Sequence, residues 1–312
     1  MQIAWLFPGQ GSQSVGMAKD VLAASPAARD VFGRADAALG ESLSRLILEG
    51  PEDVLTLTAN AQPAIVTVST AILAAIRERA PGLPPPQCAA GHSLGEYSAL
   101  VAAGALTLED AVRLVRARGR AMQDAVPPNV GAMAAIMGVD PATLEELCRE
   151  AAQGEVVSCA NFNAPGQIVI AGNSGAVARA SELVSAAKGK AIALKVSAPF
   201  HCALMAPAAR LVDDELAKIP VRPLAFPIVA NVDARPNSDP GRVRELLVRQ
   251  VDGAVRWEQI MGFMKESGVT HALEIGPGKV LAGLAKRCAK EIKVLSVSDA
   301  AALGQVSTFL AT

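Results

Sequence analysis

A serine between glycines, in the run Gly91-His92-Ser93-Leu94-Gly95, is the feature of this sequence that most directly suggests chemistry. The residues around it predict a short strand over Gln87–Gly91 and a helix over about Leu94–Ala103. A tight turn between a strand and a helix exposes the central serine, and the free N–H groups of the helix start face whatever the serine attacks. The pattern therefore indicates a nucleophile for acyl transfer, with a glycine-flanked serine in an ordinary turn as the alternative.

A serine hydroxyl needs a general base, and the chain has 3 histidines. His92 is adjacent to the serine, and the turn should direct neighbouring side chains apart, so we interpret it as a packing or loop-ordering residue. His271 begins an apolar run, which favours a structural place at the end of a strand. His201 lies where a smaller subdomain returns to the larger domain, and sites often form in clefts between domains. We therefore predict His201 as the base and Cys202, beside it, as an inert buried thiol.

A predicted helix over Thr107–Asp124 places Arg118 on its apolar stripe, together with Ala111, Val115 and Met122. An arginine on an inward-facing stripe costs too much free energy unless its charge is paired. Two pairings stay open at this point. One is a buried ion pair with an internal Asp or Glu, and the other is a fork that binds a substrate carboxylate through two hydrogen bonds.

Two glycine-rich loops follow predicted strands. The loop Gly9-Gln10-Gly11-Ser12-Gln13 comes after a strand over Gln2–Phe7, and it lacks the pattern of a phosphate loop or a dinucleotide fingerprint. Its position at the carboxyl end of a strand allows it to supply a second oxyanion donor near the serine. The run Glu274-Ile275-Gly276-Pro277-Gly278-Lys279 is another turn from a strand into a helix, and we interpret it as a turn with helix capping.

The composition bounds the class of protein. With 312 residues and 51% hydrophobic residues, the chain can build one large domain with an insertion, or two domains. A net charge of −1 without a basic patch argues against a nucleic-acid partner. The apolar runs fall short of the roughly 18–20 residues that span a membrane, and the N-terminus resembles a first strand rather than a signal peptide. The 5 scattered cysteines predict a reduced, cytoplasmic protein.

Helices that alternate with short apolar strands predict an α/β fold with a mainly parallel sheet covered on both faces. Residues 129–198 differ, because their pattern reads strand, helix, strand, strand, helix, strand and predicts an inserted ferredoxin-like (βαββαβ) subdomain. Residues 1–128 and 199–312 would then form the larger, catalytic domain. The expected strands and helices are Gly131–Gly138, Pro141–Ala152, Val156–Phe162, Gln167–Ala171, Gly175–Ala187 and Ala191–Val196 in the subdomain, and Val15–Ala24, Pro26–Leu39, a helix from Pro63 to Arg79, Pro207–Lys218, Pro227–Asn231, Gly241–Val251, Trp257–Glu266, His271–Ile275 and Lys293–Val297 in the larger domain.

Six segments in this order resemble those of malonyl-CoA:acyl carrier protein transacylases. They span nearly the whole chain, and they are specific as a set although each is weak alone. The segments begin at Phe7 (FPGQGSQ), Gly91 (GHSLGEY), Arg118 (RG), Asn161 (NFNAPGQ), His201 (HCALM) and Glu274 (EIGPGKVL).

The resemblance implies an α/β-hydrolase-like large domain and a ping-pong reaction, with malonyl-CoA and an acyl carrier protein as partners and no cofactor. It implies Ser93 as nucleophile, His201 as base and then acid, and an amide carbonyl, assigned to Gln250, as the group that orients the histidine. It further implies an oxyanion hole from the backbone N–H groups of Gln10 and Leu94. The implied oligomeric state is a monomer.

The resemblance also implies how the substrate is selected. Arg118 would hold the malonyl carboxylate and so select against acetyl groups, and Asn161 would lie on the subdomain face of the cleft. Phe200 departs from the small residue of many fatty-acid members and resembles malonyl-selective polyketide acyltransferases, where it would disfavour methylmalonyl groups. Fatty-acid and polyketide pathways therefore both stay open. The competing functions are a serine esterase or thioesterase and a non-catalytic subunit that docks a carrier protein.

Overall fold

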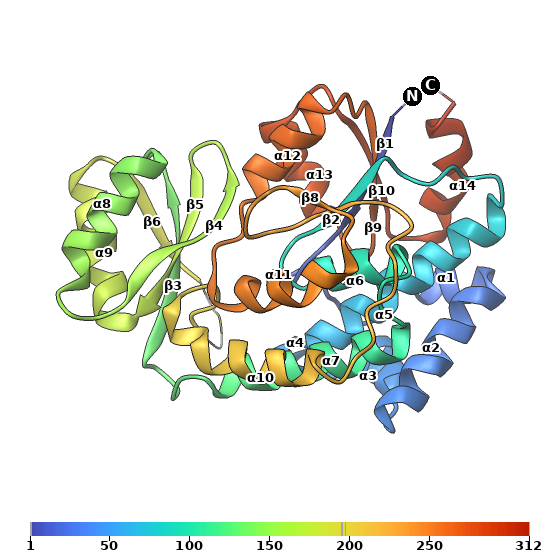
Figure 1. The fold of residues 1–312 in the computed structure, drawn as a ribbon, viewed down its shortest axis with the longest axis horizontal. Helices are drawn as coiled ribbons and strands as arrows, with labels where there is room; N and C mark the ends of the chain where they lie inside the picture. The colour runs from blue at the N-terminus through green and yellow to red at the C-terminus, as the bar shows by residue number, and fades with distance from the viewer. Residues whose placement is uncertain (1, 195, 197, 312) are drawn as a thin grey trace.

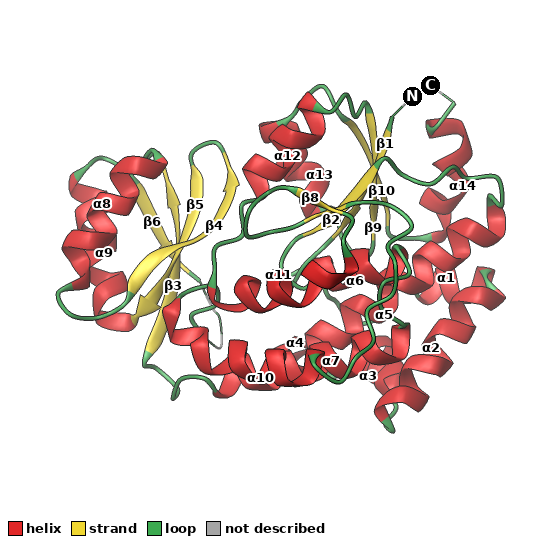
Figure 2. Ribbon diagram, in the orientation of Figure 1, coloured by secondary structure: helices red, strands yellow, loops and turns green. Residues whose placement is uncertain are grey.

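The computed structural model describes residues 2–194, 196 and 198–311, which fold around two separate sheets. Figure 1 shows a smaller unit of strands and helices from the middle of the chain, beside a larger unit built from both ends of the chain. Figure 2 shows that the strands of the larger unit are enclosed by helices, whereas the smaller unit has its helices on one side of its sheet.

The larger sheet has six strands in the order β10-β9-β1-β2-β7-β8. Their bounds are β1 (Ile3–Phe7), β2 (Cys88–Gly91), β7 (Ile228–Val229), β8 (Pro236–Asn237), β9 (His271–Ile275) and β10 (Lys293–Val297). The first five strands of that order run parallel, and β8 pairs antiparallel with β7 at the edge. The mainly parallel sheet is therefore confirmed, and the two-residue strand β8 was not predicted.

Successive residues of β1 pack against opposite faces of the sheet, which explains why this strand is apolar throughout. Trp5 and Phe7 belong to a core that includes α5 (Thr58–Arg79) and α7 (Leu108–Asp124). Ala4 and Leu6 belong to a second core formed with α12 (Trp257–Glu266) and α13 (Val280–Cys288). Both faces of the sheet are therefore covered, so the site has to form at an edge or at the end of a strand.

The smaller sheet is antiparallel, with strands in the order β4-β5-β3-β6. Its elements are β3 (Gly131–Met137), α8 (Pro141–Ala152), β4 (Val157–Ala164), β5 (Gln167–Asn173), α9 (Ser174–Ala186) and β6 (Lys190–Ala193). This is the ferredoxin-like element order that the sequence predicts. The last strand ends at Ala193, short of the predicted Val196, and residue 195 of the predicted range lies outside the described residues.

Most helices begin and end within one or two residues of their predicted bounds. These are α2 (Pro26–Leu39), α6 (Gly95–Ala102), α7, α8, α9, α10 (Ala206–Leu216), α11 (Pro240–Asp252) and α12. The prediction for α1 (Lys19–Ala24) was too long, because Ala18 adopts the left-handed conformation with φ 62°. The start of α5 was also wrong, since that helix begins at Thr58 and contains Pro63 in its interior. The sequence reading missed α3 (Leu43–Glu49), α4 (Glu52–Thr56) and α14 (Ala300–Phe309).

Helix α5 is, among the described residues, the one helix long and apolar enough to cross a membrane by length and composition. The sequence predicted only the part of this helix from Pro63 onward, and polar residues such as Gln62 and Thr67 divide its apolar residues into short runs. Of its most apolar window, 78% is buried inside the fold. It therefore has the character of the core helix of a folded domain.

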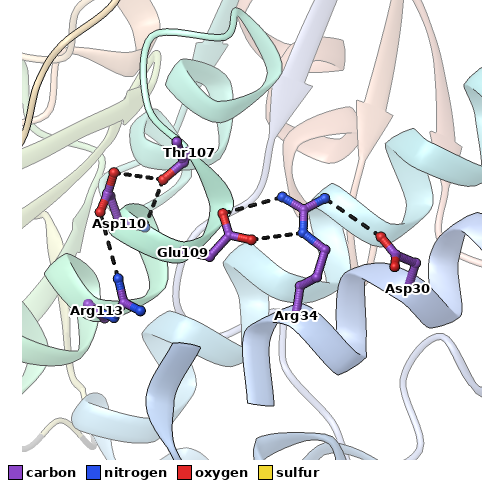
Figure 3. A network of polar contacts seen from close by, with 6 residues as sticks. All are labelled: Asp30, Arg34, Thr107, Glu109, Asp110 and Arg113. Atoms are coloured by element: carbon purple, nitrogen blue, oxygen red, sulfur yellow. Dashed lines mark hydrogen bonds and ion pairs between the residues drawn. The ribbon is translucent and has the colours of Figure 1, made fainter. Parts of the chain in front are cut away.

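Helices α2 and α7 are also joined at the surface by a chain of charged groups, shown in Figure 3. Arg34 of α2 contacts Glu109 at 2.8 Å and Asp30 at 3.6 Å. Thr107 caps α7, as predicted, by accepting a hydrogen bond from the backbone N–H of Asp110 at 3.0 Å. These contacts fix the start of the helix that carries Arg118.

Candidate active site

Ser93 lies at a strained turn between β2 and α6. Its backbone is in the left-handed region, with φ 52°, which a non-glycine residue adopts only where the surroundings impose it. The flanking glycines are needed for space: a Cβ atom on Gly91 would lie 1.9 Å from the Gly95 carbonyl carbon, and one on Gly95 would lie 2.2 Å from the Phe7 oxygen. The predicted strand-to-helix turn is therefore present, with its serine at the carboxyl end of a parallel strand.

Asn231, which follows β7, holds this turn from the neighbouring strand. Its Oδ1 accepts a hydrogen bond from the backbone N–H of Ser93 at 2.7 Å, and its Nδ2 donates to the Gly91 carbonyl at 2.7 Å. The side chain is fully buried. Sequence reasoning missed this residue, although its place at the end of a predicted parallel strand was the available signal.

His201 contacts the serine directly. The distance from Ser93 Oγ to His201 Nε2 is 2.7 Å, and the Nδ1–H of His201 donates to the backbone carbonyl of Gln250 at 2.8 Å. Because a carbonyl only accepts, this contact assigns the proton of the neutral ring to Nδ1 and leaves Nε2 free to accept from the serine hydroxyl. Burial, together with the nearby charge of Arg118, lowers the pKa of His201 to about 3, so the ring is neutral at pH 7.

Arg118 also faces the serine, and the groups of the described residues that contact it are neutral. Its Nη2 donates to Ser93 Oγ at 3.1 Å and to Gln250 Oε1 at 2.9 Å, and its Nη1 donates to Gln62 Oε1 at 2.8 Å. The residue is 1% exposed, and burial lowers its pKa. Within the described part of the chain no carboxylate lies within 4.0 Å of the guanidinium, so the internal ion pair that the sequence left open is not formed there. The guanidinium also lies over the ring of Tyr97, 5.4 Å from its centroid.

Gln250 links these groups through both its backbone and its side chain. Besides orienting His201, it accepts from Arg118 through Oε1, and its Nε2 donates to the Ser93 carbonyl and to Glu96 Oε2, each at 2.8 Å. Glu96 is 2% exposed, and burial raises its pKa to about 7. Sequence reasoning did not single out Glu96, whose signal was an acidic residue in the first turn of an otherwise apolar helix.

The two expected oxyanion donors lie beside the serine. Gln10 and Leu94 both line the cleft that contains Ser93. Neither backbone N–H donates to another backbone group among the residues described, so both remain available to a ligand. The Gln10 side chain donates to Thr58 Oγ1 at 3.2 Å, which holds the loop after β1 against the start of α5. Their role in an oxyanion hole stays a prediction.

The cleft has a volume of about 350 Å³ and lies between the two units of the molecule. The smaller unit contributes Asn161, Met133 and Val169 to the lining of the cleft. Phe200, which precedes His201 in the chain, also lines the cleft. Asn161 is 7% exposed, and a bridge to Val255 ties its strand to the larger unit. Seven of the eight predicted site residues therefore line this cleft. The eighth, Gln250, is fully buried and contacts Arg118 and His201. The role of each stays a prediction.

The other two histidines, His92 and His271, have partners other than Ser93 Oγ. His92 Nε2 lies 2.8 Å from Asn163 Oδ1, and its ring packs 5.6 Å from that of Trp257, so it joins the turn to the smaller unit. His271 is 5% exposed and packs against Phe309, outside the residues that line the cleft. Both positions agree with the structural interpretation of these histidines.

Two further predictions concern Glu274 and Cys202. Glu274 accepts hydrogen bonds from the backbone N–H groups of Leu281 and Ala282 at the start of α13, which confirms the capping interpretation of its turn. Cys202 is buried, and burial raises its thiol pKa to about 11, as expected of an inert cysteine. Among the described residues, no group of three or more His, Cys, Asp or Glu side chains is placed to hold a metal ion.

Comparison with known proteins shows the class of protein to which the chain belongs. Residues 4–308 match the family described as the acyl transferase domain, so the protein is an acyl transferase. A transferase of this class needs a nucleophile, a base and a means of choosing its acyl group, and the cleft presents residues suited to each.

Individual relatives narrow the class. The malonyl CoA-acyl carrier protein transacylase of Escherichia coli K12 is 47% identical over 97% of both chains, and that of Bacillus subtilis is 46% identical over 96% of this chain and 94% of its own. Among solved structures, the acyl-carrier-protein S-malonyltransferase of Bartonella henselae is 46% identical with a TM-score of 0.96 over 100% of both chains. A malonyl-transacylase in complex with its type II PKS acyl-carrier protein is 43% identical, with a TM-score of 0.95 over 100% of both chains. The chain belongs to the malonyl CoA-acyl carrier protein transacylase family.

Proposed function

We propose that this protein transfers the malonyl group from malonyl-CoA to the phosphopantetheine thiol of an acyl carrier protein, through a malonyl ester on Ser93. The observation that carries the proposal is the contact of one serine hydroxyl with both a neutral histidine and a buried arginine that lacks a carboxylate partner in the described structure. The names of its relatives supply the donor and the acceptor.

The chemistry takes two matched halves. His201 Nε2 accepts the Ser93 proton as Oγ attacks the thioester carbonyl, and the C–S bond then breaks as His201 protonates the leaving coenzyme A thiolate. In the second half His201 deprotonates the carrier thiol, which attacks the serine ester, and the proton returns to Ser93. The Gln250 carbonyl stabilises the imidazolium that forms in each half, and the N–H groups of Gln10 and Leu94 receive the oxyanion.

Arg118 supplies selection for the malonyl group. A malonyl ester on Ser93 places its carboxylate one methylene beyond the ester carbonyl, and Arg118 Nη2 is already 3.1 Å from the serine oxygen. A carboxylate at this place would form an ion pair with the Arg118 guanidinium, whose described contacts are amides, a hydroxyl and an aromatic ring. An acetyl group has no carboxylate and would leave the guanidinium without a counter-ion. Asn161 and Phe200, which also line the cleft, would limit the space for the acyl group, and the Phe200 ring would exclude a methyl branch.

The same family membership frames the rest of the proposal. The larger unit would be an α/β-hydrolase-like catalytic domain of residues 1–128 and 199–312, with residues 129–198 inserted as the subdomain. The protein would work as a cytoplasmic monomer without a cofactor, in fatty-acid or polyketide synthesis. Nucleic acid and membrane have no part in this scheme.

Intact-protein mass after brief incubation with malonyl-CoA, methylmalonyl-CoA or acetyl-CoA tests the proposal. We expect a malonyl-sized adduct that maps to Ser93, with little adduct from the other donors and none in Ser93→Ala. A covalent malonyl adduct that persists in Ser93→Ala would refute the assigned nucleophile.

Release of free coenzyme A separates the competing functions. An esterase or thioesterase would release coenzyme A and free malonate at the same rate with or without carrier protein. A docking subunit would bind carrier protein without adduct or release. Transfer requires that the carrier thiol outcompete water for the acyl-enzyme.

A further inference from the structure

A buried carboxylate outside the reacting groups contacts the residues that hold the site together. Glu96 lies in the first turn of α6, three residues after Ser93. Its Oε2 accepts two hydrogen bonds, from Gln250 Nε2 at 2.8 Å and from the backbone N–H of Asn231 at 3.1 Å. One oxygen therefore contacts two different elements, α11 and the segment after β7.

Each of these two donors positions a different part of the site. Asn231 holds the backbone of the serine turn on both sides, through the N–H of Ser93 and the carbonyl of Gly91. Gln250 orients His201 through its backbone carbonyl and Arg118 through its side-chain oxygen. Through Asn231 and Gln250, Glu96 is therefore linked by hydrogen bonds to the nucleophile, the base and the arginine.

The charges explain why a carboxylate is needed there. The Gln250 carboxamide lies between Arg118 and Glu96, with its oxygen on the cation and its N–H on the anion. Turning the amide around would point its N–H at the guanidinium and its oxygen at the carboxylate, which is repulsive at both ends. An ionised Glu96 therefore selects one orientation of Gln250, and it balances the charge of Arg118 through that amide.

We propose that Glu96 is a positioning residue for malonyl transfer, whose ionised carboxylate holds the Gln250 side chain so that Arg118 stays aimed at Ser93 and at the carboxylate of the incoming acyl group. The inference rests on the proposed transfer of malonyl groups. It adds a residue that touches neither substrate nor reacting atoms and acts through Gln250 and Asn231.

The titration of this group provides a readout. Burial raises the pKa of Glu96 to about 7, opposed by hydrogen bonds from Gln250 and Asn231 and by the charge of Arg118 on α7, while the charge of Asp233 after β7 raises it further. The other titratable neighbours are Tyr97, whose pKa is raised to about 12, and His201, whose pKa is near 3. Neither of those titrates near pH 7, so we expect a loss of activity that is specific to malonyl-CoA, as the pH falls through about 7, to report the ionisation of Glu96.

The test compares kcat/KM for malonyl-CoA and acetyl-CoA across about pH 5.5–9 in the wild type, Glu96→Gln and Glu96→Asp. Glu96→Gln keeps an oxygen that can accept both hydrogen bonds and removes the charge. We expect it to lower malonyl transfer about 10- to 100-fold, to lower acetyl transfer much less, and to abolish the malonyl-specific decline below pH 7. Glu96→Asp keeps the charge and should restore part of both the rate and the pH profile.

Glu274→Gln is the matched control, because Glu274 is also fully buried and accepts backbone hydrogen bonds, but contacts none of Ser93, Arg118 or Gln250. It should lower the Tm and leave the malonyl-to-acetyl ratio and the pH profile as in the wild type. A Glu96→Gln enzyme with the wild-type ratio and profile would overturn the inference. Should that variant fail to fold, the wild type decides, because a malonyl-to-acetyl ratio that stays constant from about pH 6 to pH 8 overturns it as well. A wild type that forms no malonyl adduct on Ser93 would instead refute the proposed function.

Discussion

Helix α7 presents buried arginines to two different regions, and the two are completed in different ways. Arg116 is 8% exposed and contacts the carboxylate of Glu41 and the amide oxygen of Asn60, in the region between α2, α3 and α5. Arg118 is 1% exposed and contacts amides and a hydroxyl in the cleft. Arg116 and Arg118 are two positions apart on α7, so their side chains leave the helix about 200° apart around its axis and reach two different regions.

The difference separates an arginine whose charge is paired with a carboxylate of the fold from one that contacts only amide and hydroxyl oxygens in the described structure. The region around Arg116 continues to the surface, where Arg34 pairs with Glu109 and Arg113 lies near Asp110 (Figure 3). Arg34, Arg113 and Arg116 each lie within 4.0 Å of a carboxylate of the fold. In the cleft, the nearest negative charge is separated from Arg118 by the Gln250 side chain, so a carboxylate brought by a substrate can contact the guanidinium directly.

The largest expected effect is on the choice of acyl group. Arg118→Ala should lower kcat/KM for malonyl-CoA relative to acetyl-CoA by about 100-fold or more, because the buried partner of the malonyl carboxylate is lost. Arg116→Ala, two residues along the same helix, should leave that ratio unchanged. Competition assays that follow both acyl-enzymes by mass measure the ratio directly. Equal losses for both donors in Arg118→Ala would make Arg118 structural and remove the contrast between the two regions.

The second effect is on stability, and its size should differ between the two arginines. Arg116→Met breaks an ion pair whose carboxylate is 45% exposed, so the free energy of unfolding should fall by about 1–3 kcal/mol. Arg118→Met removes a buried cation that lacks a direct counter-ion in the described structure, but it also leaves the amide oxygens of Gln62 and Gln250 without their donor. These two effects oppose each other, so the free energy of unfolding should change by less than about 1 kcal/mol. Urea unfolding of both variants and the wild type gives the comparison, provided the m values agree. A loss of stability in Arg118→Met as large as that in Arg116→Met would contradict a site prepared for a ligand.

Local patterns in the sequence were enough to single out three residues that contact one another in the structure. Ser93 was found from glycine spacing, Arg118 from a helical stripe, and His201 from its place at a junction between subdomains. Each of these signals is contained within a short stretch of chain. The resemblance to a family then supplied Gln250, Gln10, Leu94, Asn161 and Phe200, for which the residues alone gave weak signals or none.

The residues that hold this site were not predictable in the same way. Asn231 and Gln62 meet Ser93 and Arg118 across 138 and 56 residues of chain, and Glu96 meets Gln250 across 154. A lone amide or acid carries no periodicity that names its partner, because tertiary packing chooses it. The same reasoning applies to the fold, since α3 and α4, with 7 and 5 residues, are too short to show a helical period.

The smallest expected effect is the contribution to stability of the surface ion pair between Arg34 and Glu109. The side chains of Arg34 and Glu109 are 48% and 33% exposed, so water and salt screen their attraction. A double-mutant cycle with Arg34→Ala and Glu109→Ala should give a coupling of about 0.2–1 kcal/mol in the free energy of unfolding, which falls in high salt. Malonyl transfer should stay at the wild-type rate in both variants. A coupling well above 1 kcal/mol, or one that does not fall in high salt, would show that this pair contributes to stability as a buried ion pair does. The contrast between arginines paired with carboxylates and Arg118 would then extend to the surface of the protein.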